Sequence, residues 1–347
     1  MPRAVVLLAV GVVFLAACGV AAAEQGQRTY LPLTLRDPTP TPSRGAWATK
    51  TPMSTARCCM GVAAGPNGRI YAVGGYAGRI LATVEEYNPA TDTWTRKADM
   101  PTARASLGLA AAPDGKLYAV GGGNETASVN TVEAYDPATD SWATRSPLPT
   151  GRAELGVAVG GDGRLYAIGG HAVQAGSFGP ALATVERYDP ASDSWEAVAP
   201  LPSPAYGVGV AASASTGKVY AVGGYGPVSG GSVSVGNQDV VNWYDPSSGA
   251  WSATRFSGFL PAHHGMAEAG GQLYVVGGQR LGVVRPYAWA FDPIRGAWTE
   301  AAPMAAARSQ LGLAGVNGKL YAIGGYTSER AGCCNVATVE EYTPPGS

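Results

Sequence analysis

The segment VEAYDPATDSW at residues 132–142 recurs along the chain and decides its fold. It returns as VEEYNPATDTW at residues 84–94 and as VERYDPASDSW at residues 185–195. Three looser or shortened copies are VNWYDPSSGAW (241–251), FDPIRGAW (291–298) and VEEYTP (339–344). Self-similarity with a period of about 50 residues predicts an array of stacked supersecondary units.

A short apolar run that ends in Gly-Gly precedes each copy. The six runs are YAVGG (71–75), YAVGG (118–122), YAIGG (166–170), YAVGG (220–224), YVVGG (274–278) and YAIGG (321–325). The separation between a tryptophan and the second glycine of the next run hardly changes along the chain, and Trp94 to Gly122 is typical. Trp47 stands at that same separation from Gly75 with no unit before it, whereas the last unit has no tryptophan. We therefore predict that the strand around Trp47 completes the last unit and closes the array into a ring.

Each unit is expected to hold four short antiparallel strands. The first two are joined at an Asn-Gly or Asp-Gly pair in four units: Asn67-Gly68, Asp114-Gly115, Asp162-Gly163 and Asn317-Gly318. These dipeptides predict two-residue hairpin turns in which both residues have positive φ. The V-E-x-Y strand, a turn at Asp-Pro and the tryptophan strand complete the unit. No stretch shows a helical period, so the predicted class is all-β.

These features together resemble the kelch repeat: Gly-Gly after a β-run, then Tyr-Asp-Pro, then tryptophan, in units of about 50 residues. The resemblance covers residues 46–347. It implies a six-bladed β-propeller, in which each blade is a four-stranded antiparallel sheet beside a central channel. Ring closure leaves only short, protected sheet edges.

The N-terminal part carries a predicted export signal. Residues 1–23 form an apolar targeting segment. Its LAAC motif, Leu15 to Cys18, resembles a bacterial lipobox, which would make Cys18 the lipidated mature N-terminus; ordinary cleavage after Ala23 is the alternative. Residues 24–45 are rich in Pro and Thr and predict a stiff linker. We therefore expect an extracytoplasmic protein, either a membrane-anchored lipoprotein on the cell surface or a secreted one, that meets the membrane only through this lipid.

Four of the six units pair an arginine at their start with a glutamate in the V-E-x-Y strand. The arginines are Arg57, Arg104, Arg152 and Arg308, and the glutamates are Glu85, Glu133, Glu186 and Glu340. The other two units have Ala205 and His263 near the arginine position. At the glutamate position they have Asn242 and Trp289. Because the arginine and the glutamate are kept or lost together, we predict a partly buried Arg–Glu contact in four blades. A charge that is left buried without its partner destabilises the folded protein by roughly 3–5 kcal/mol. A ring of arginines that binds an anion is the alternative.

Two cysteine pairs follow the export segment: Cys58-Cys59 and Cys333-Cys334. The resemblance brings their loops to one face, where the first and last units meet. An exported protein favours disulfides, and we predict at least one bond between the two pairs, with its connectivity open. Two disulfides between neighbours are the second interpretation. A metal site of four thiolates is the third, although Cys-x-x-Cys spacing is absent.

Relatives with this repeat line one face of the channel with the loops after Gly-Gly and the connections into each first strand. The matching polar and aromatic residues here are Tyr76, Ser106, Glu154, His171, Tyr225, Gln279, Gln310 and Tyr326. This set suits a protein loop or a sugar. We therefore predict a monomeric binding scaffold without a cofactor or metal, whose partner is a protein or a glycan. The net charge of −1 gives no basic surface for nucleic acid.

Two enzyme hypotheses follow from the resemblance. Copper-radical sugar oxidases of this fold need two histidines at one metal, and the chain has only His171, His263 and His264. The last two are adjacent, so on a strand they would point to opposite faces. Sugar mutarotases work by acid–base groups in the channel, and Glu154 with His171 could serve in this way. Only the fold analogy supports that activity.

Overall fold

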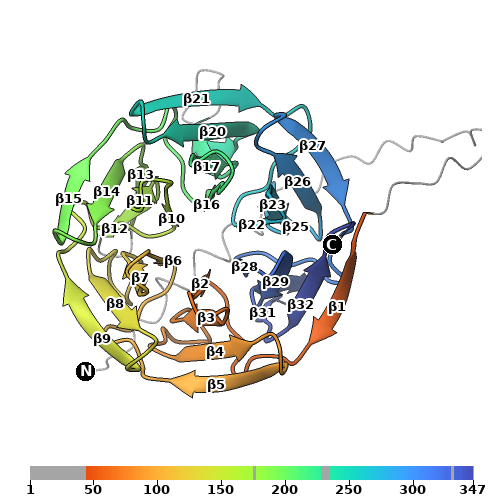
Figure 1. Cartoon of the computed structure of the whole chain (residues 1–347), viewed down its shortest axis with the longest axis horizontal. Coiled ribbons are helices and arrows are strands. Elements are labelled where there is room, and N and C mark those ends of the chain that lie inside the picture. The colour runs from red at the N-terminus through yellow and green to blue at the C-terminus, as the bar shows by residue number, and fades with distance from the viewer. Residues whose placement is uncertain (1–43, 175–176, 228–234, 330–331, 347) are drawn as a thin grey trace, which may run out of the picture.

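The computed structural model describes residues 44–174, 177–227, 235–329 and 332–346, which form a ring of six sheets around a central channel (Figure 1). Each sheet is a blade of four antiparallel strands, and the first strand of each blade faces the channel. This confirms the predicted six-bladed propeller. Within the described ranges, no helix is long and apolar enough to cross a membrane.

The blades follow one another in chain order. From the channel outward, blade 1 has β2 (Gly61–Ala64), β3 (Ile70–Val73), β4 (Val84–Asn88) and β5 (Thr93–Lys97), and blade 2 has β6 (Gly108–Ala111), β7 (Leu117–Val120), β8 (Val132–Asp136) and β9 (Ser141–Arg145). In the same order, blade 3 has β10 (Gly156–Val159), β11 (Leu165–Ile168), β14 (Val185–Asp189) and β15 (Ser194–Ala197), and blade 4 has β16 (Gly209–Ala212), β17 (Val219–Val222), β20 (Val240–Asp245) and β21 (Ala250–Arg255). Blade 5 has β22 (Gly265–Ala269), β23 (Gln272–Val276), β26 (Ala288–Asp292) and β27 (Ala297–Ala301), and blade 6 has β28 (Gly312–Val316), β29 (Lys319–Ile323), β32 (Val339–Thr343) and, outermost, β1 (Ala46–Lys50).

The N-terminal strand β1 is the outermost strand of the last blade, as the position of Trp47 predicts. It pairs antiparallel with β32, and Trp47 lies opposite Tyr342 with ring centroids 5.0 Å apart. The indole Nε1 of Trp47 donates to the carbonyl of Ala302 at 2.7 Å, which lies just beyond the outer strand of blade 5. Trp94 reaches back to Thr51 of the preceding blade in the same way, at 2.9 Å. The first strand of the chain therefore repeats the indole contact that blades 1 to 4 make with the preceding blade.

The turns between the first two strands differ from the prediction in three blades. Of the four predicted pairs, only Asn317-Gly318 has positive φ at both positions. In blade 1, Gly68 has a φ of +70° and Asn67 does not have positive φ, and the loop closes wider, with Gly65 N donating to Arg69 O at 2.8 Å. A type I turn followed by a left-handed glycine fits this longer loop. The prediction of two-residue turns was therefore wrong for Asn67, Asp114 and Asp162.

The Gly-Gly pairs let neighbouring blades meet closely. Gly74 has a φ of +65°, and a Cβ built on it would lie 2.4 Å from the carbonyl oxygen of Arg104 in blade 2. Gly75 N donates to that same oxygen at 2.9 Å. A side chain at this position would push the two blades apart, which explains why the pair recurs in every unit.

The four arginines that follow a proline are fully buried, and each is paired with the glutamate of its own blade. The Nη–Oε distances are 2.9 Å for Arg57–Glu85, 2.8 Å for Arg104–Glu133 and 2.6 Å for Arg308–Glu340, and Arg152 is paired with Glu186. Arg104 also donates to the carbonyls of Gly121 and Thr131 at 2.8 and 2.7 Å. Burial lowers the pKa of Arg104, and the carboxylate of Glu133 opposes that effect.

Blades 4 and 5 have no such pair, and polar side chains of their loops make other contacts. Gln238 donates to the carbonyl of Pro204 at 3.0 Å in blade 4. In blade 5, Arg280 pairs with Asp239 at 2.7 Å and donates to the carbonyl of Leu260 at 3.0 Å. These contacts are less buried than the arginine–glutamate pairs, and the one between Arg280 and Asp239 joins the loops of blades 5 and 4.

Replacing Arg104 with methionine should lower the free energy of unfolding by about 3–5 kcal/mol, because Glu133 is left buried without its partner. The double variant Arg104→Met/Glu133→Leu should recover most of that loss. The matched control is Arg96→Met, since Arg96 is exposed and its pair with Asp99 contributes about 1 kcal/mol or less. Urea unfolding measures all three variants; equal losses for Arg104→Met and Arg96→Met would contradict the bracing role.

Candidate functional site

Six residues, one from each blade, meet around the channel just before the first strand of their blade. They are Cys59, Ser106, Glu154, Gly207, His263 and Gln310. All six have positive φ, between 50° and 61°. The backbone N–H of each donates to the carbonyl of the one before it, and Cys59 N closes the circle on Gln310 O at 3.1 Å. Five of them are not glycine, so backbone strain is concentrated at the channel, as is common at functional sites.

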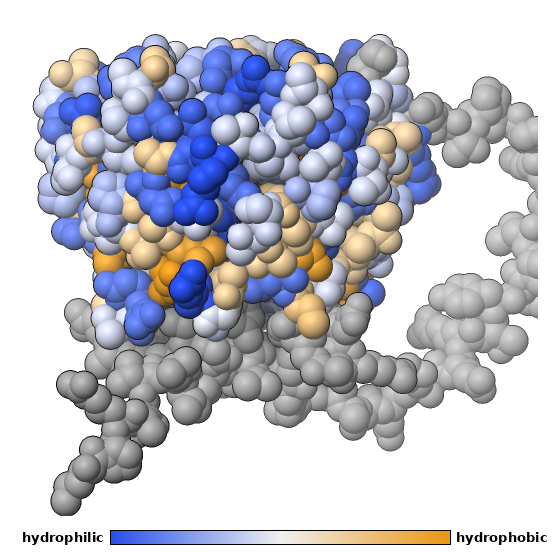
Figure 2. All heavy atoms as spheres, turned by 90° about the horizontal axis from the view of Figure 1, so that it is seen from below, coloured by the Kyte–Doolittle hydropathy of each residue, from blue (hydrophilic) through white to orange (hydrophobic). Residues whose placement is uncertain are grey.

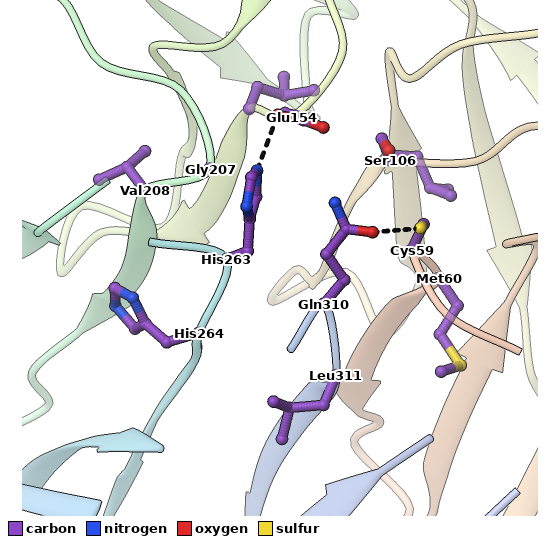
Figure 3. Close-up of a pocket in the computed structure, with 12 residues that line it drawn as sticks. Cys59, Met60, Ser106, Glu154, Gly207, Val208, His263, His264, Gln310 and Leu311 are labelled. Carbon is purple, nitrogen blue, oxygen red and sulfur yellow. Dashed lines mark hydrogen bonds and ion pairs between the residues drawn. The ribbon is translucent and has the colours of Figure 1, made fainter. Parts of the chain in front are cut away.

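A cavity of about 110 Å³ lies inside this circle (Figure 3). The six residues form its polar tier, and the residue after each forms a second tier: Met60, Leu107, Leu155, Val208, His264 and Leu311. Among the described residues that line it, Glu154 is the only carboxylate. The cavity therefore combines one negative side chain with an apolar floor.

Glu154 begins a hydrogen-bond chain that runs across three blades. His263 Nε2 lies 2.9 Å from Glu154 Oε2, and Figure 3 shows the two side chains facing each other. Gln279 Nε2 lies 3.0 Å from His263 Nδ1, and the Tyr326 hydroxyl donates to Gln279 Oε1 at 2.9 Å. With the amide held this way, His263 accepts at Nδ1 and donates from Nε2 to the carboxylate.

Aromatic side chains enclose the same carboxylate. His171 Nε2 lies 3.6 Å from Glu154 Oε2, and the rings of His171 and Tyr206 are 5.0 Å apart. The ring of Tyr225 lies 5.5 Å from that of His263. Burial by itself raises the pKa of Glu154, but its contacts with His263 and His171 outweigh burial and lower it. Burial, and then the nearby carboxylate, raise the pKa of Tyr206 to about 12, so its hydroxyl stays protonated at neutral pH.

The structure places all eight sequence-predicted face residues around this mouth. Ser106, Glu154 and Gln310 line the cavity itself. The other five, which directly follow the glycine pairs, form antiparallel bridges with the segments that enter the first strands: Tyr76 with Cys58, His171 with Ala153, Tyr225 with Tyr206, Gln279 with Ala262 and Tyr326 with Ser309.

Sequence reasoning missed two residues of the site and misjudged the register of a third. Tyr206 and Gly207 were not predicted to lie there. The repeat pattern placed His263 near the arginine position, but Pro261 occupies that position. Its carbonyl accepts from Gly224 N, just as the carbonyl of Arg104 accepts from Gly75 N. His263 instead corresponds to Glu154. Counting two residues on from the arginine position finds His263 only once the backbone hydrogen bonds have placed Pro261 at that position.

The adjacent histidines do not lie on a strand, because β22 begins after them at Gly265. His263 points to Glu154 and His264 turns away (Figure 3). His264 is buried, with Nδ1 lying 3.1 Å from the Pro261 carbonyl, and burial lowers its pKa to about 4. His264 is therefore neutral at physiological pH, and it replaces the leucine that three other blades have there. In the part of the chain that the structure describes, no group of three or more His, Cys, Asp or Glu side chains is arranged to hold a metal ion.

Four short hairpins stand beside the mouth, on blades 3 to 6. They are β12 (His171–Gln174) with β13 (Ser177–Ala181), β18 (Tyr225–Pro227) with β19 (Val235–Asn237), β24 (Gln279–Arg280) with β25 (Val283–Val284), and β30 (Tyr326–Glu329) with β31 (Gly332–Asn335). At the third hairpin, Leu281 and Val283 are 81% and 45% exposed. Phe259 is 68% exposed beneath the guanidinium of Arg280, 4.4 Å away. Seen from the side, the outer wall of the ring is mostly hydrophilic, and apolar residues gather toward its lower edge in this view (Figure 2).

The first cysteine pair lies at this mouth, where blades 1 and 6 meet. Cys58 and Cys59 are buried, with their sulfurs 2.6 Å apart, and Cys59 donates to Gln310 Oε1 at 2.6 Å. Cys334 is exposed, and the side chain of Cys333 lies outside the described residues. A bond between the two pairs stays a prediction. The signal segment, Cys18 and nearly all of the linker also lie outside the described residues.

Comparison with known proteins agrees with this architecture. The family described as the Kelch motif matches residues 57–101, 105–149, 156–202, 261–305 and 307–345. Kelch-like protein 35 of Mus musculus is 37% identical over 97 residues, which is 28% of this chain and only 16% of that protein. The solved structure of YjhT superposes with a TM-score of 0.67 at 19% identity, covering 84% of this chain and 95% of that one, and shares the fold. The chain belongs to the Kelch motif family.

Proposed function

We propose that this protein is a binding propeller whose channel-mouth face holds a protein or glycan ligand outside the cytoplasm. One observation carries the proposal: six loops converge on a polar cavity whose single carboxylate, Glu154, is held in place by His263 and aromatic rings. Kelch-like protein 35 and the matched family give the fold, and the ligand is inferred from the chemistry of the mouth.

The size of the cavity limits what it can admit. Sites for whole small molecules usually enclose about 300–1,000 Å³, and this one encloses about 110 Å³. It therefore suits one side chain of a partner or one edge of a sugar. The rest of the ligand would lie on the hairpins, where Phe259, Leu281 and Arg280 offer the aromatic, apolar and arginine groups that are common at interface centres.

The carboxylate selects the group that enters. Glu154 accepts hydrogen bonds from His263 through Oε2, and a carboxylate has further acceptor positions. A sugar hydroxyl or the ammonium or guanidinium of a partner side chain can donate to them. The rings of Tyr206 and Tyr225 beside the carboxylate provide a surface that either a sugar or a cation can contact.

We expect arrays of glycans and of peptides, probed with the labelled propeller, to yield a ligand whose binding depends on the mouth. Glu154→Gln should weaken it at least tenfold, because a hydrogen bond to a charged group contributes about 1.5–3 kcal/mol. The matched control is Glu196→Gln on the outer strand β15, which should leave the dissociation constant unchanged. A ligand that binds both variants equally would place the site elsewhere.

A second candidate is proton transfer on a free sugar, favoured by the Glu154–His263 pair in the cavity. If it operates, the wild-type protein should accelerate the exchange of sugar anomers in NMR spectra, and Glu154→Gln should abolish the acceleration. Unchanged exchange rates with sialic acid and common hexoses would leave binding as the function.

The proposed location rests on the N-terminal sequence alone. Mass spectrometry of the mature protein should find Cys18 lipidated as the first residue. An unmodified N-terminus at Glu24 would instead indicate a freely secreted propeller.

A further inference from the structure

The adjacent cysteines at the channel are the feature that binding does not explain. Their sulfurs are 2.6 Å apart, between the length of a disulfide bond, about 2.05 Å, and an ordinary non-bonded contact. The corresponding pairs in blades 2, 3 and 5 are Ala105-Ser106, Ala153-Glu154 and Ala262-His263. Blade 1, which lies beside blade 6, has two cysteines at these positions instead.

We propose that Cys58 and Cys59 form a redox-modification site that closes a disulfide between neighbouring residues by exchange with a small-molecule disulfide such as oxidised glutathione. Cys59 lines the cavity, whereas Cys58 lies behind it at 2% exposure. Of the two thiols, only Cys59 therefore faces the channel mouth, and the exchange begins there.

The exchange takes two steps. The Cys59 thiolate attacks one sulfur of the small disulfide, forms a mixed disulfide and releases one thiolate. Cys58 then attacks the bonded sulfur of Cys59 and releases the second thiolate. The two cysteine protons pass to the two released thiolates, so the protein loses two hydrogens and the small disulfide gains them.

The position of the two cysteines in the fold makes this bond easy to reduce and slow to form. Neighbouring Cα atoms are about 3.8 Å apart across a trans peptide, below the usual disulfide range of about 4.4–6.8 Å, and strained disulfides belong to the labile class. Burial, with help from Cys58, raises the pKa of Cys59 well above its ordinary value, which keeps the thiolate scarce at neutral pH. We therefore expect a bond that forms slowly and is readily reduced again, in contrast to a permanent link between blades.

Oxidation changes the cavity directly. In the reduced state, the Cys59 thiol donates to Gln310 Oε1 at 2.6 Å. The disulfide has no hydrogen to donate, so the Gln310 amide loses this partner. Both residues line the cavity, and its hydrogen-bonding groups thus differ between the two states.

Peptide mapping tests the inference on the full chain. The protein is equilibrated in reduced and oxidised glutathione at graded ratios, both natively and during refolding from urea, then alkylated and digested with trypsin. Cleavage at Arg57 and Arg69 isolates peptide 58–69, whose only cysteines are Cys58 and Cys59, while Cys333 and Cys334 lie in peptide 331–347. We expect peptide 58–69 to become unalkylated and two hydrogens lighter as oxidised glutathione increases.

Three variants sharpen the result. Cys59→Ser should abolish the lighter peptide, and the channel tolerates serine there because Ser106 occupies the same place in blade 2. Cys333→Ser/Cys334→Ser, the matched control, should retain it. Gln310→Leu removes the acceptor that stabilises the thiol, and should raise the ratio of disulfide to dithiol about 2- to 10-fold at a fixed glutathione ratio. Full alkylation of both cysteines after refolding at every ratio, or linkage of peptide 58–69 to peptide 331–347, would overturn the proposal.

Discussion

Ring closure by β1 is the constraint on which the rest of the molecule depends. A propeller blade cannot cover both of its faces alone, so each sheet needs a neighbour on either side. The pairing of β1 with β32, and the indole of Trp47 on Ala302, join the two ends of the chain within one sheet. The inner strand of the same sheet, β28, lies beside β2 of blade 1, so this sheet also brings the last blade against the first.

The closed ring also explains why the channel is strained. Six entering loops must meet in a circle, and each gives one backbone N–H to its neighbour and accepts another. That geometry requires a left-handed residue in every loop, which non-glycine residues adopt at some energetic cost. Side chains such as Glu154 and His263 are thereby held at defined positions before any ligand arrives. The rigid sheets behind them provide the support that a preorganised site needs.

The six blades differ in what they contribute to stability and to the channel mouth. Blades 1, 2, 3 and 6 contain a buried Arg–Glu pair that ties the entering loop to the strands behind it. Blades 4 and 5 lack that pair, and they contribute Tyr206, Gly207, His263 and Gln279 to the mouth. In these two blades a partly exposed ion pair, Arg280 with Asp239, joins the neighbouring loops. The polar and aromatic side chains collected there are the ones that suit recognition.

The sequence by itself determined the repeat, the number of blades and the closing strand, because the spacing of glycine pairs and tryptophans is a local pattern copied along the chain. The resemblance to the kelch repeat implied a place near the channel for Ser106, Glu154 and Gln310. The repeat pattern also paired each buried arginine position with a glutamate position, since the two vary together between units.

Only the tertiary structure decided what the irregular units do. Spacing in blade 5 is ambiguous by two residues, so the alignment of His263 with Glu154 rests on the backbone circle. The contact between His263 and Glu154 joins residues 109 positions apart in sequence, and that of Cys59 with Gln310 joins residues 251 apart. No local pattern encodes such contacts, because they exist only once all six loops are brought to a common axis.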